Sequence, residues 1–204
     1  ALGSRAMFGT GTCDTTNKFR VCEDMYGSPF QLAYPDVDRT EFLAVLGANP
    51  AVSGNTLYHL PHAVQRLKDI TRRGGRVVFI NPRRIETAQA GEHVFIRPDT
   101  DVFLLAAWCN ALINSGTVDE VRIARHMKNY AALKEAVAGW TAERQAAVTG
   151  IDVDTFNSLV ESHRRANGAG LYMATGVNQG RSGTHCFWLL ECINAITGNL
   201  DRAG

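Results

Sequence analysis

The chain has 204 residues, of which 45% are hydrophobic and 20% are charged, and its net charge is +1. This is the composition of a globular protein, and the balance of 21 basic and 20 acidic residues disfavours a general binder of nucleic acid or of anionic membranes. The sequence shows no signal peptide or membrane span, and its five cysteines include no CxxC pair, which argues against a disulfide framework and a zinc knuckle.

Cysteine usage favours a reducing, cytoplasmic location. Cys109, Cys186 and Cys192 lie in apolar runs and are predicted to be small core residues. The chain begins without a methionine, and both of its ends read like interior loops. We therefore expect it to be a segment of a longer polypeptide.

Short apolar runs alternate with helical patterns after a first part, residues 1–40, that is rich in glycine, proline and polar residues and is predicted to be irregular. The pattern predicts, in chain order, a strand at 41–47, a helix at 60–74, strands at 76–81 and 92–96, helices at 101–116, 118–129, 141–150 and 152–168, a strand at 170–175 and a helix at 184–198.

This alternation of strands and helices implies parallel pairing with right-handed crossovers. We expect an α/β fold: a doubly wound, mostly parallel sheet with helices on both faces. The predicted organisation is an irregular segment at 1–40 that carries a candidate metal-ligand loop, a Rossmann-like cofactor-binding domain with a helical insertion at 41–168, and a strand and helix at 169–204 that return to the neighbouring α/β region.

Each predicted strand is followed directly by residues suited to a polar ligand, and ligands of parallel sheets bind outside the carboxyl ends of the strands. Glycine lets a backbone approach a phosphate, arginine can grip a phosphate, and Asn or Asp can read a purine or a ribose. A single such loop is better explained as an ordinary turn with capping residues, whereas four in register favour a nucleotide site. The candidate cofactor-binding residues are Gly47, Asn49, Pro50, Ser53, Asn81, Pro82, Arg83, Thr87, Arg97, Thr100, Asp101, Gly176 and Gln179.

The best-known nucleotide motifs are absent, because no GxGxxG follows the first strand and no GK[ST] occurs. The stretches that do occur, in this order, are LGANPAVS, RRGGRVVFINPRRIETA, HVFIRPDTD and GVNQGRSGTH followed by LLECINAITGNLDRAG. This ordered set resembles the molybdopterin oxidoreductase family, also called the dimethyl sulfoxide reductase family, from about Phe8 to Gly204.

The resemblance implies molybdenum or tungsten held by two molybdopterin guanine dinucleotides, with two-electron redox at the metal. It implies an iron–sulfur cluster in a part of the full protein outside this chain, a small-molecule substrate, and as partners the rest of the polypeptide and an iron–sulfur electron-transfer subunit. No nucleic-acid or membrane contact is implied, and the isolated segment is expected to be inactive. The guanine pocket would include Asn49, Pro50, Asn81, Arg83, Arg97, Thr100 and Asp101, with Gly176 and Gln179 nearer the pterin.

One position departs from the family pattern at the end of the second strand. The family usually has Asp-Pro-Arg there, whereas this chain has Asn81, Pro82 and Arg83. Asn81 can retain only part of the contacts of a carboxylate.

Proteins of this family add one metal ligand from a loop before the GANP strand. By resemblance, Cys22 in TTNKFRVCEDMYGS is the first candidate, as a thiolate, and Cys13 and Asp14 are the second. The alternative is that Cys22 is a buried small residue on a short helix, packed with Met25 and Tyr26. Formate dehydrogenases of the family place His directly after the ligand; here a glutamate follows, which disfavours formate as the substrate.

Two further residues are candidate catalytic contacts. Arg181 is a candidate for binding substrate or pterin, and His185 could face the pterin or simply begin a helix. Two other functions stay open from the residues alone. One is a non-catalytic nucleotide-binding module, as in the middle domain of a thiamine-diphosphate enzyme, and the other is a scaffold domain.

Overall fold

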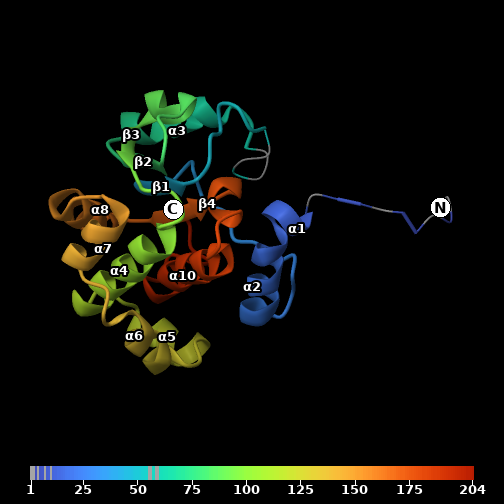
Figure 1. The fold of residues 1–204 in the computed structure, drawn as a ribbon. Helices are drawn as coiled ribbons and strands as arrows, with labels where there is room; N and C mark the ends of the chain where they lie inside the picture. Colours follow the sequence, from blue (N-terminus) through green and yellow to red (C-terminus); the bar gives the residue numbers. More distant parts are fainter. Residues whose placement is uncertain (1–2, 4, 7, 10, 55–56, 58–59) are drawn as a thin grey trace.

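The computed structural model describes residues 3, 5–6, 8–9, 11–54, 57 and 60–204, and Figure 1 shows a central sheet with helices around it. The elements in chain order are α1 (Gly11–Asp14), α2 (Thr16–Tyr26), β1 (Phe42–Leu46), α3 (Ala63–Arg72), β2 (Arg76–Asn81), the 3-10 helix η1 (Glu86–Ala90), β3 (Glu92–Phe95), α4 (Asp101–Asn114), α5 (Glu120–His126), α6 (Tyr130–Val137), α7 (Ala142–Thr149), α8 (Val153–Arg165), β4 (Ala169–Met173), α9 (Thr175–Asn178) and α10 (Gly183–Ile196).

The sheet has the strand order β3-β2-β1-β4, and all three pairings are parallel. Leu46 of β1 lies opposite both Ile80 of β2 and Met173 of β4, so these strands end at the same edge. Every residue of β1 is buried, as expected for a central strand that is covered on both faces. The predicted doubly wound α/β fold is confirmed.

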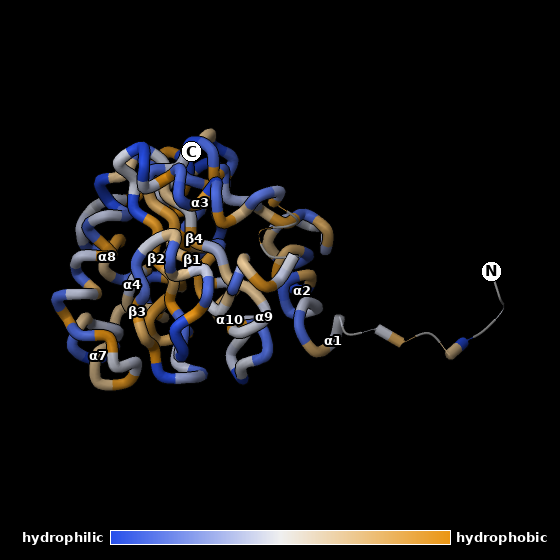
Figure 2. Tube along the Cα trace, turned by 90° about the horizontal axis from the view of Figure 1, so that it is seen from above, coloured by the Kyte–Doolittle hydropathy of each residue, from blue (hydrophilic) through white to orange (hydrophobic). Residues whose placement is uncertain are grey.

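Two apolar cores lie on opposite faces of the sheet because successive side chains of a strand point to opposite sides. Phe42 and Leu46 belong to a core that includes residues of α4, α8 and α10, whereas Leu43 and Val45 pack with residues of α3 and η1. Figure 2 shows the hydrophobic strands, in orange, between these layers. In the described part of the chain, no helix combines the length and the apolarity that crossing a bilayer requires.

Within the predicted irregular segment, the structure contains a regular helix, α2. Val21 and Cys22 are buried, and Met25 packs against the same core, so the apolar positions are only one and four residues apart. Gly27 ends the helix in a left-handed conformation, with φ of 75°. The prediction of an irregular segment is wrong for these residues because the short apolar stripe is embedded in a polar sequence.

The predicted helix at 118–129 is shorter in the structure. α5 ends at His126, and Asn129 adopts a φ of 60° and begins the separate helix α6, which the sequence analysis did not predict. Asparagine tolerates the left-handed region better than most residues, so this break is a local property of the chain. β4 pairs with β1 and so lies in the same sheet as the other three strands.

Side chains satisfy the outward-facing backbone groups of the edge strand β4. Asn194 accepts a hydrogen bond from the Leu171 amide at 3.3 Å, Asn199 accepts one from the Ala169 amide at 3.2 Å, and Lys18 donates to the Met173 carbonyl. Edge strands with unpaired backbone groups attract other strands. This edge is therefore closed by amide and ammonium groups.

A buried histidine lies beneath the sheet in the larger core. Trp108 Nε1 donates to His163 Nδ1 at 3.2 Å, and the ring of Phe42 stacks on the imidazole at 5.7 Å. Burial lowers the pKa of His163 from 6.5 to about 4. The folded state therefore holds this histidine neutral across the mildly acidic range.

The pH dependence of stability should show this histidine. Because the folded pKa is the lower one, the unfolded state takes up the proton first, so stability present above pH 6.5 is lost as the pH falls toward 4, by up to about 3 kcal/mol. His163→Gln should have a flatter profile in urea denaturation between pH 7 and pH 4. Parallel profiles for the two proteins would contradict this assignment.

Candidate functional site

The loops after β1 and β4 touch through two glycines at the carboxyl edge. The Gly176 amide donates to the Gly47 carbonyl at 3.0 Å, and Gly47 has a φ of 59°. A Cβ on Gly47 would lie 2.6 Å from the Val177 amide nitrogen, and one on Gly176 would lie 2.7 Å from the Gly47 oxygen. Only glycine fits at either position, so the predicted pair Gly47 and Gly176 is brought together by the fold.

Asn49 and Thr87 connect the loop after β1 to the 3-10 helix after β2. Asn49 Oδ1 accepts a hydrogen bond from Thr87 Oγ1 at 2.7 Å, and Thr87 Oγ1 in turn accepts one from the Ala51 amide at 2.9 Å. Thr87 is fully buried, Pro50 is buried, and Ser53 is exposed. These contacts fix the shape of the edge, so Thr87 acts inside the protein and not at its surface.

Thr87→Val should therefore destabilise the chain by about 1–3 kcal/mol, because it leaves the Ala51 amide and one Asn49 lone pair without their partner. Thr155→Val is the matched control: it also removes a threonine hydroxyl bond, but an exposed one to Asp152, and should cost about 0.5 kcal/mol or less. Equal losses in urea denaturation would show that the buried network contributes nothing.

The loop after β2 contains the stretch with the unusual asparagine. Asn81 is buried and contacts the Ala48 carbonyl only weakly, at 3.5 Å, while Pro82 and Arg83 are exposed. Arg83 pairs with Glu86 at 3.3 Å. His93 on β3, which the sequence analysis did not single out, contacts the Arg83 carbonyl through Nε2 at 2.8 Å and thereby holds this loop against the sheet.

Arg97 after β3 is bound to the protein itself. Its guanidinium donates to the carbonyls of Ala147 at 2.6 Å and Val148 at 3.1 Å, in the last turn of α7. These are carbonyls that a helix end leaves without partners, so Arg97 stabilises that helix end. Thr100 donates to the Arg97 carbonyl at 2.7 Å and makes no side-chain cap to α4.

Asp101 is the first residue of α4 and is half-buried. Burial, with a smaller contribution from the charge of Asp99, raises the pKa of its carboxyl to about 6. The carboxyl is thus poised to exchange a proton near neutral pH, or to accept hydrogen bonds from a ligand that displaces water.

Asp99 joins the β3–α4 loop to the α9–α10 loop. Its Oδ1 accepts a hydrogen bond from the Arg181 amide at 2.9 Å, and its backbone has a φ of 64°. Asp99 stands in the predicted loop after β3 but not among the predicted site residues; aspartate is one of the residues that adopt this conformation readily. The side chains of Gln179, Arg181 and His185 are exposed beside it, and that of Arg181 is 94% exposed.

Cys22 lies on α2, fully buried, next to a polar cluster shared with α10. Tyr26 Oη donates to Glu191 Oε2 at 2.6 Å. Burial and the charge of Glu191 raise the pKa of the Cys22 thiol to about 11, while the charge of Lys18 acts in the opposite direction.

The other two ligand candidates lie on α1. Cys13 is exposed, and Asp14 is half-buried and accepts a hydrogen bond from Thr15 at 2.6 Å. α2 meets the candidate site at its first half, where Lys18 donates to the carbonyl of Met173, the last residue of β4, and Asn17 contacts Asn178 at 3.5 Å. Within the described residues, no three His, Cys, Asp or Glu side chains are grouped so as to hold a metal.

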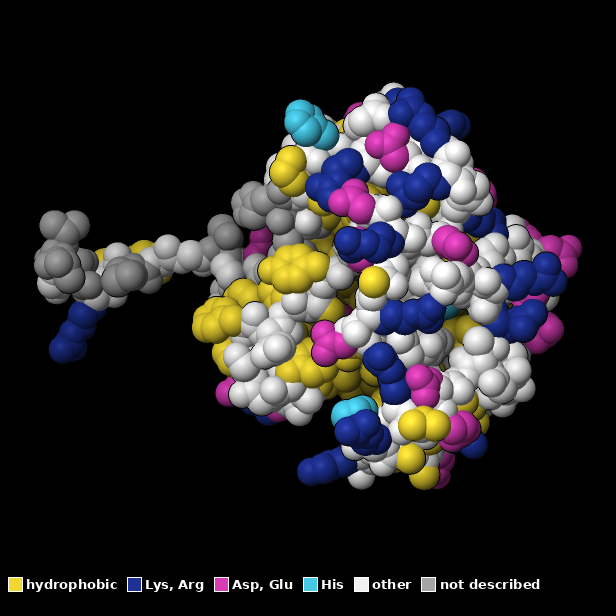
Figure 3. All heavy atoms as spheres, turned by 180° about the vertical axis from the view of Figure 1, so that it is seen from behind, with side chains coloured by type: hydrophobic (Ala, Val, Ile, Leu, Met, Phe, Trp, Pro, Cys, Tyr) yellow, Lys and Arg dark blue, Asp and Glu magenta, His cyan; other side chains and the backbone are white. Residues whose placement is uncertain are grey.

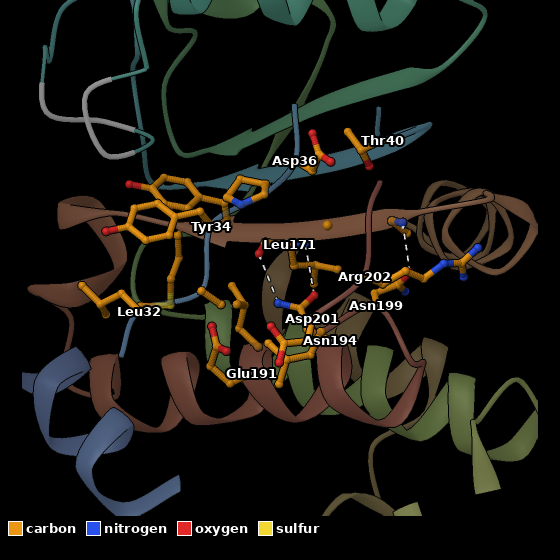
Figure 4. A pocket seen from close by; sticks show the side chains of 18 of the residues that line it. Leu32, Tyr34, Asp36, Thr40, Leu171, Glu191, Asn194, Asn199, Asp201 and Arg202 are labelled. Atoms are coloured by element: carbon orange, nitrogen blue, oxygen red, sulfur yellow. Dashed lines mark hydrogen bonds between the residues drawn. The ribbon is translucent and has the colours of Figure 1, made fainter. Parts of the chain in front are cut away.

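Two hollows lie away from the carboxyl edge of the sheet, where the candidate loops meet. One, of about 390 Å³, runs along β4, with Tyr34, Asp36, Glu191 and Asn194 around it, and Figure 4 shows Asn194 bonded to Leu171 in its wall. The other, of about 1240 Å³, lies between α2, the α5–α6 pair and α10. Neither includes a predicted site residue.

Comparison with known proteins finds relatives that are named as dehydrogenases or reductases. The chain is 25% identical over 171 residues to formate dehydrogenase H of Escherichia coli, covering 83% of the chain and 23% of that protein. It is 27% identical over 210 residues to assimilatory nitrate reductase of Haloferax mediterranei, covering 98% of the chain and 28% of that protein. It is 23% identical over 188 residues to dimethyl sulfoxide/trimethylamine N-oxide reductase of Rhodobacter capsulatus, covering 85% of the chain and 22% of that protein.

The chain thus spans about a quarter of the length of these curated relatives. No protein-family model matches it. Among solved structures, acetylene hydratase from Pelobacter acetylenicus superposes with a TM-score of 0.76 and 19% identity, covering 90% of the chain and 24% of that protein. This last likeness shows the fold.

Proposed function

Because the chain is homologous to a segment of the molybdopterin oxidoreductases, the dimethyl sulfoxide reductase family, we propose that it is the central cofactor-binding part of a molybdenum- or tungsten-dependent oxidoreductase. The observation that carries the proposal is the meeting of all four motif loops at the carboxyl edge of one parallel sheet. The cofactor is molybdopterin guanine dinucleotide, and the complete enzyme carries out two-electron redox at the metal.

The α9–α10 loop offers a site for the anionic part of such a cofactor. α10 begins after Ser182, which makes no side-chain cap. The Gly183 amide donates to the Gly180 carbonyl at 3.2 Å, so the amides that follow it in the first turn of this 14-residue helix are the ones that keep their hydrogen-bonding capacity. The guanidinium of Arg181 stands beside them; its side chain is 94% exposed, and its Nε lies 3.9 Å from Asp99 Oδ2. The close contact of Gly47 with Gly176 keeps side chains out of the adjacent cradle. A diphosphate fits this combination of donors and open backbone.

The start of α4 favours a different part of the cofactor. A carboxylate at Asp101 repels phosphate, but it accepts hydrogen bonds well, and a guanine ring presents adjacent N–H groups as donors. We assign Asp101 to the guanine, with Asn81 across the edge as a second polar group. Arg97 serves by holding this loop in place through α7.

When bound, two molybdopterin dithiolenes would hold the molybdenum or tungsten that supplies the redox centre. Cys22 remains the proposed protein ligand, and ligation requires its thiolate. The positive charge of Lys18 favours that thiolate, whereas burial opposes it, so the metal itself must supply most of the stabilisation. Electrons would leave through an iron–sulfur centre elsewhere in the polypeptide or in a partner, and two relatives are named as alpha subunits of formate dehydrogenases.

Metal and nucleotide analysis of the natural polypeptide that contains this chain tests the proposal. We expect molybdenum or tungsten and extractable guanine nucleotide, at two nucleotides per metal. Cys22→Ala should lower the activity by more than about a hundredfold, beyond the loss that outer-sphere changes usually cause, while Cys13→Ala, an exposed cysteine on α1, should leave it unchanged.

The outcomes separate the alternatives. Loss of activity only in Cys13→Ala would move the ligand to α1 and contradict the Cys22 assignment. Bound nucleotide without metal would favour a non-catalytic nucleotide-binding module. Absence of both metal and nucleotide would remove the proposed function altogether.

A further inference from the structure

The larger of the two hollows is a groove with an apolar floor. Its floor comes from α2 and α10, where Met25 and the half-buried Trp188 face it, and from α6, where Leu133 does. Its volume of about 1240 Å³ exceeds that of the hollow beside β4. Figure 3 shows a hollow with yellow side chains in its depth next to the region of α5 and α6. Such a surface is the kind that proteins cover with a partner.

The wall formed by the end of α5 and the start of α6 is basic. Arg125, His126 and Lys128 line the groove there and are exposed. Among the described residues, the side chains of Arg125 and Lys128 have no hydrogen-bond or ion-pair partner. Asp201 also lines the groove.

Other charges along the groove are already neutralised within the chain. Asp24 pairs with Arg20 at 2.9 Å, and Arg122 pairs with Asp119 at 3.5 Å. The free positive charge is therefore concentrated on the α5–α6 wall. A segment that fills the groove gains most if it is apolar on one side and acidic along the edge that meets Arg125 and Lys128.

We propose that this groove is a docking site for an acidic amphipathic helix from another part of the same polypeptide. A helix suits it because its walls are helices, whose side-chain ridges accept another helix between them. The source is intramolecular because the chain matches only about a quarter of the length of its relatives, which leaves a large part of such a protein to pack against it. This inference is independent of the cofactor site on the sheet edge.

Zero-length carbodiimide cross-linking of the natural polypeptide tests the docking site, because the reagent joins an ammonium to a carboxylate only where the two are in contact. We expect Lys128 to be coupled to an Asp or Glu of a helix outside residues 1–204. Mixing isotopically light and heavy protein before the reaction distinguishes links within one polypeptide from links between two.

Matched variants control the experiment. Lys128→Arg keeps the charge but cannot form the link, so the cross-linked peptide should vanish while the thermal stability stays the same. Lys68→Arg, at a half-buried position of α3 whose ammonium contacts Gln89, should leave the Lys128 link intact. Links from Lys128 to a second copy or to another protein would overturn the proposal. Links confined to residues 1–204 would overturn it too.

Discussion

Replacing Gly47 with alanine is expected to destabilise the chain by about 3 kcal/mol or more. A left-handed backbone costs an ordinary residue about 1–2 kcal/mol, and the φ of Gly47 is 59°. The added Cβ would also lie 2.6 Å from the Val177 backbone nitrogen, which cannot move without separating β1 from α9. Separation would strain the hydrogen bond between Gly176 and the Gly47 carbonyl as well.

Gly27→Ala provides the matched control for this prediction. Gly27 has a φ of 75°, but a Cβ there meets no atom within 4 Å. Gly27→Ala should therefore lower the free energy of unfolding only by the cost of the left-handed backbone conformation, about 1 kcal/mol. Urea denaturation of both variants measures the difference. Equal losses would show that the close approach of the two loops does not limit stability.

Glu191→Gln is expected to cost about 3 kcal/mol at pH 7, because removing one partner of a buried charge pair leaves the other uncompensated. The pKa of Lys18 is lowered by burial from 10.5 to about 8, and the charge of Glu191 opposes that shift. Without Glu191, the pKa of Lys18 falls further, and the folded state must hold a neutral lysine or an unpaired cation.

The sign of the pH effect distinguishes this mechanism from a simple packing defect. Since the folded pKa of Lys18 lies below 10.5, the unfolded state binds its proton more tightly, and stability rises with pH across that interval. The deficit of Glu191→Gln relative to wild type should therefore shrink from pH 7 to pH 9, where wild-type Lys18 is itself mostly neutral. A constant deficit would contradict the charge pairing.

A double-mutant cycle with Lys18→Met completes the test. The pair Lys18→Met and Glu191→Gln removes both charges, so its loss should be smaller than the sum of the two single losses. Additive losses would mean that the two side chains do not interact across the α2–α10 interface.

The sheet could be predicted from the sequence because its two central strands, β1 and β2, are short apolar runs with a clear stop. β1 is buried at every position, and β2 is buried at all but its first. A short apolar run of this kind favours a buried strand over an amphipathic helix. α2 was missed because the residues that bury it are few and stand among polar ones. Its packing partner, α10, lies far along the chain, and no local pattern contains that information.

The candidate site was predictable as a set of loops but not as a set of contacts. That the strand ends gather at one edge follows from parallel pairing alone. In contrast, Arg97 is held by carbonyls of α7, and Asp99 holds the Arg181 amide. Both depend on long-range geometry, so residue types could not separate groups that face a ligand from groups that hold the loops.

The pairing of β1 with β4 has a consequence for synthesis on the ribosome. Phe42 of the central strand pairs with Ala169, so one side of β1 stays open until helices α4 to α8 have been made. During that interval, a fully apolar strand offers unpaired backbone groups to any neighbouring nascent chain. Products that terminate before Ala169 keep that side open permanently, so they should be recovered as aggregates or bound to chaperones, and any shortened form meant for study must retain β4.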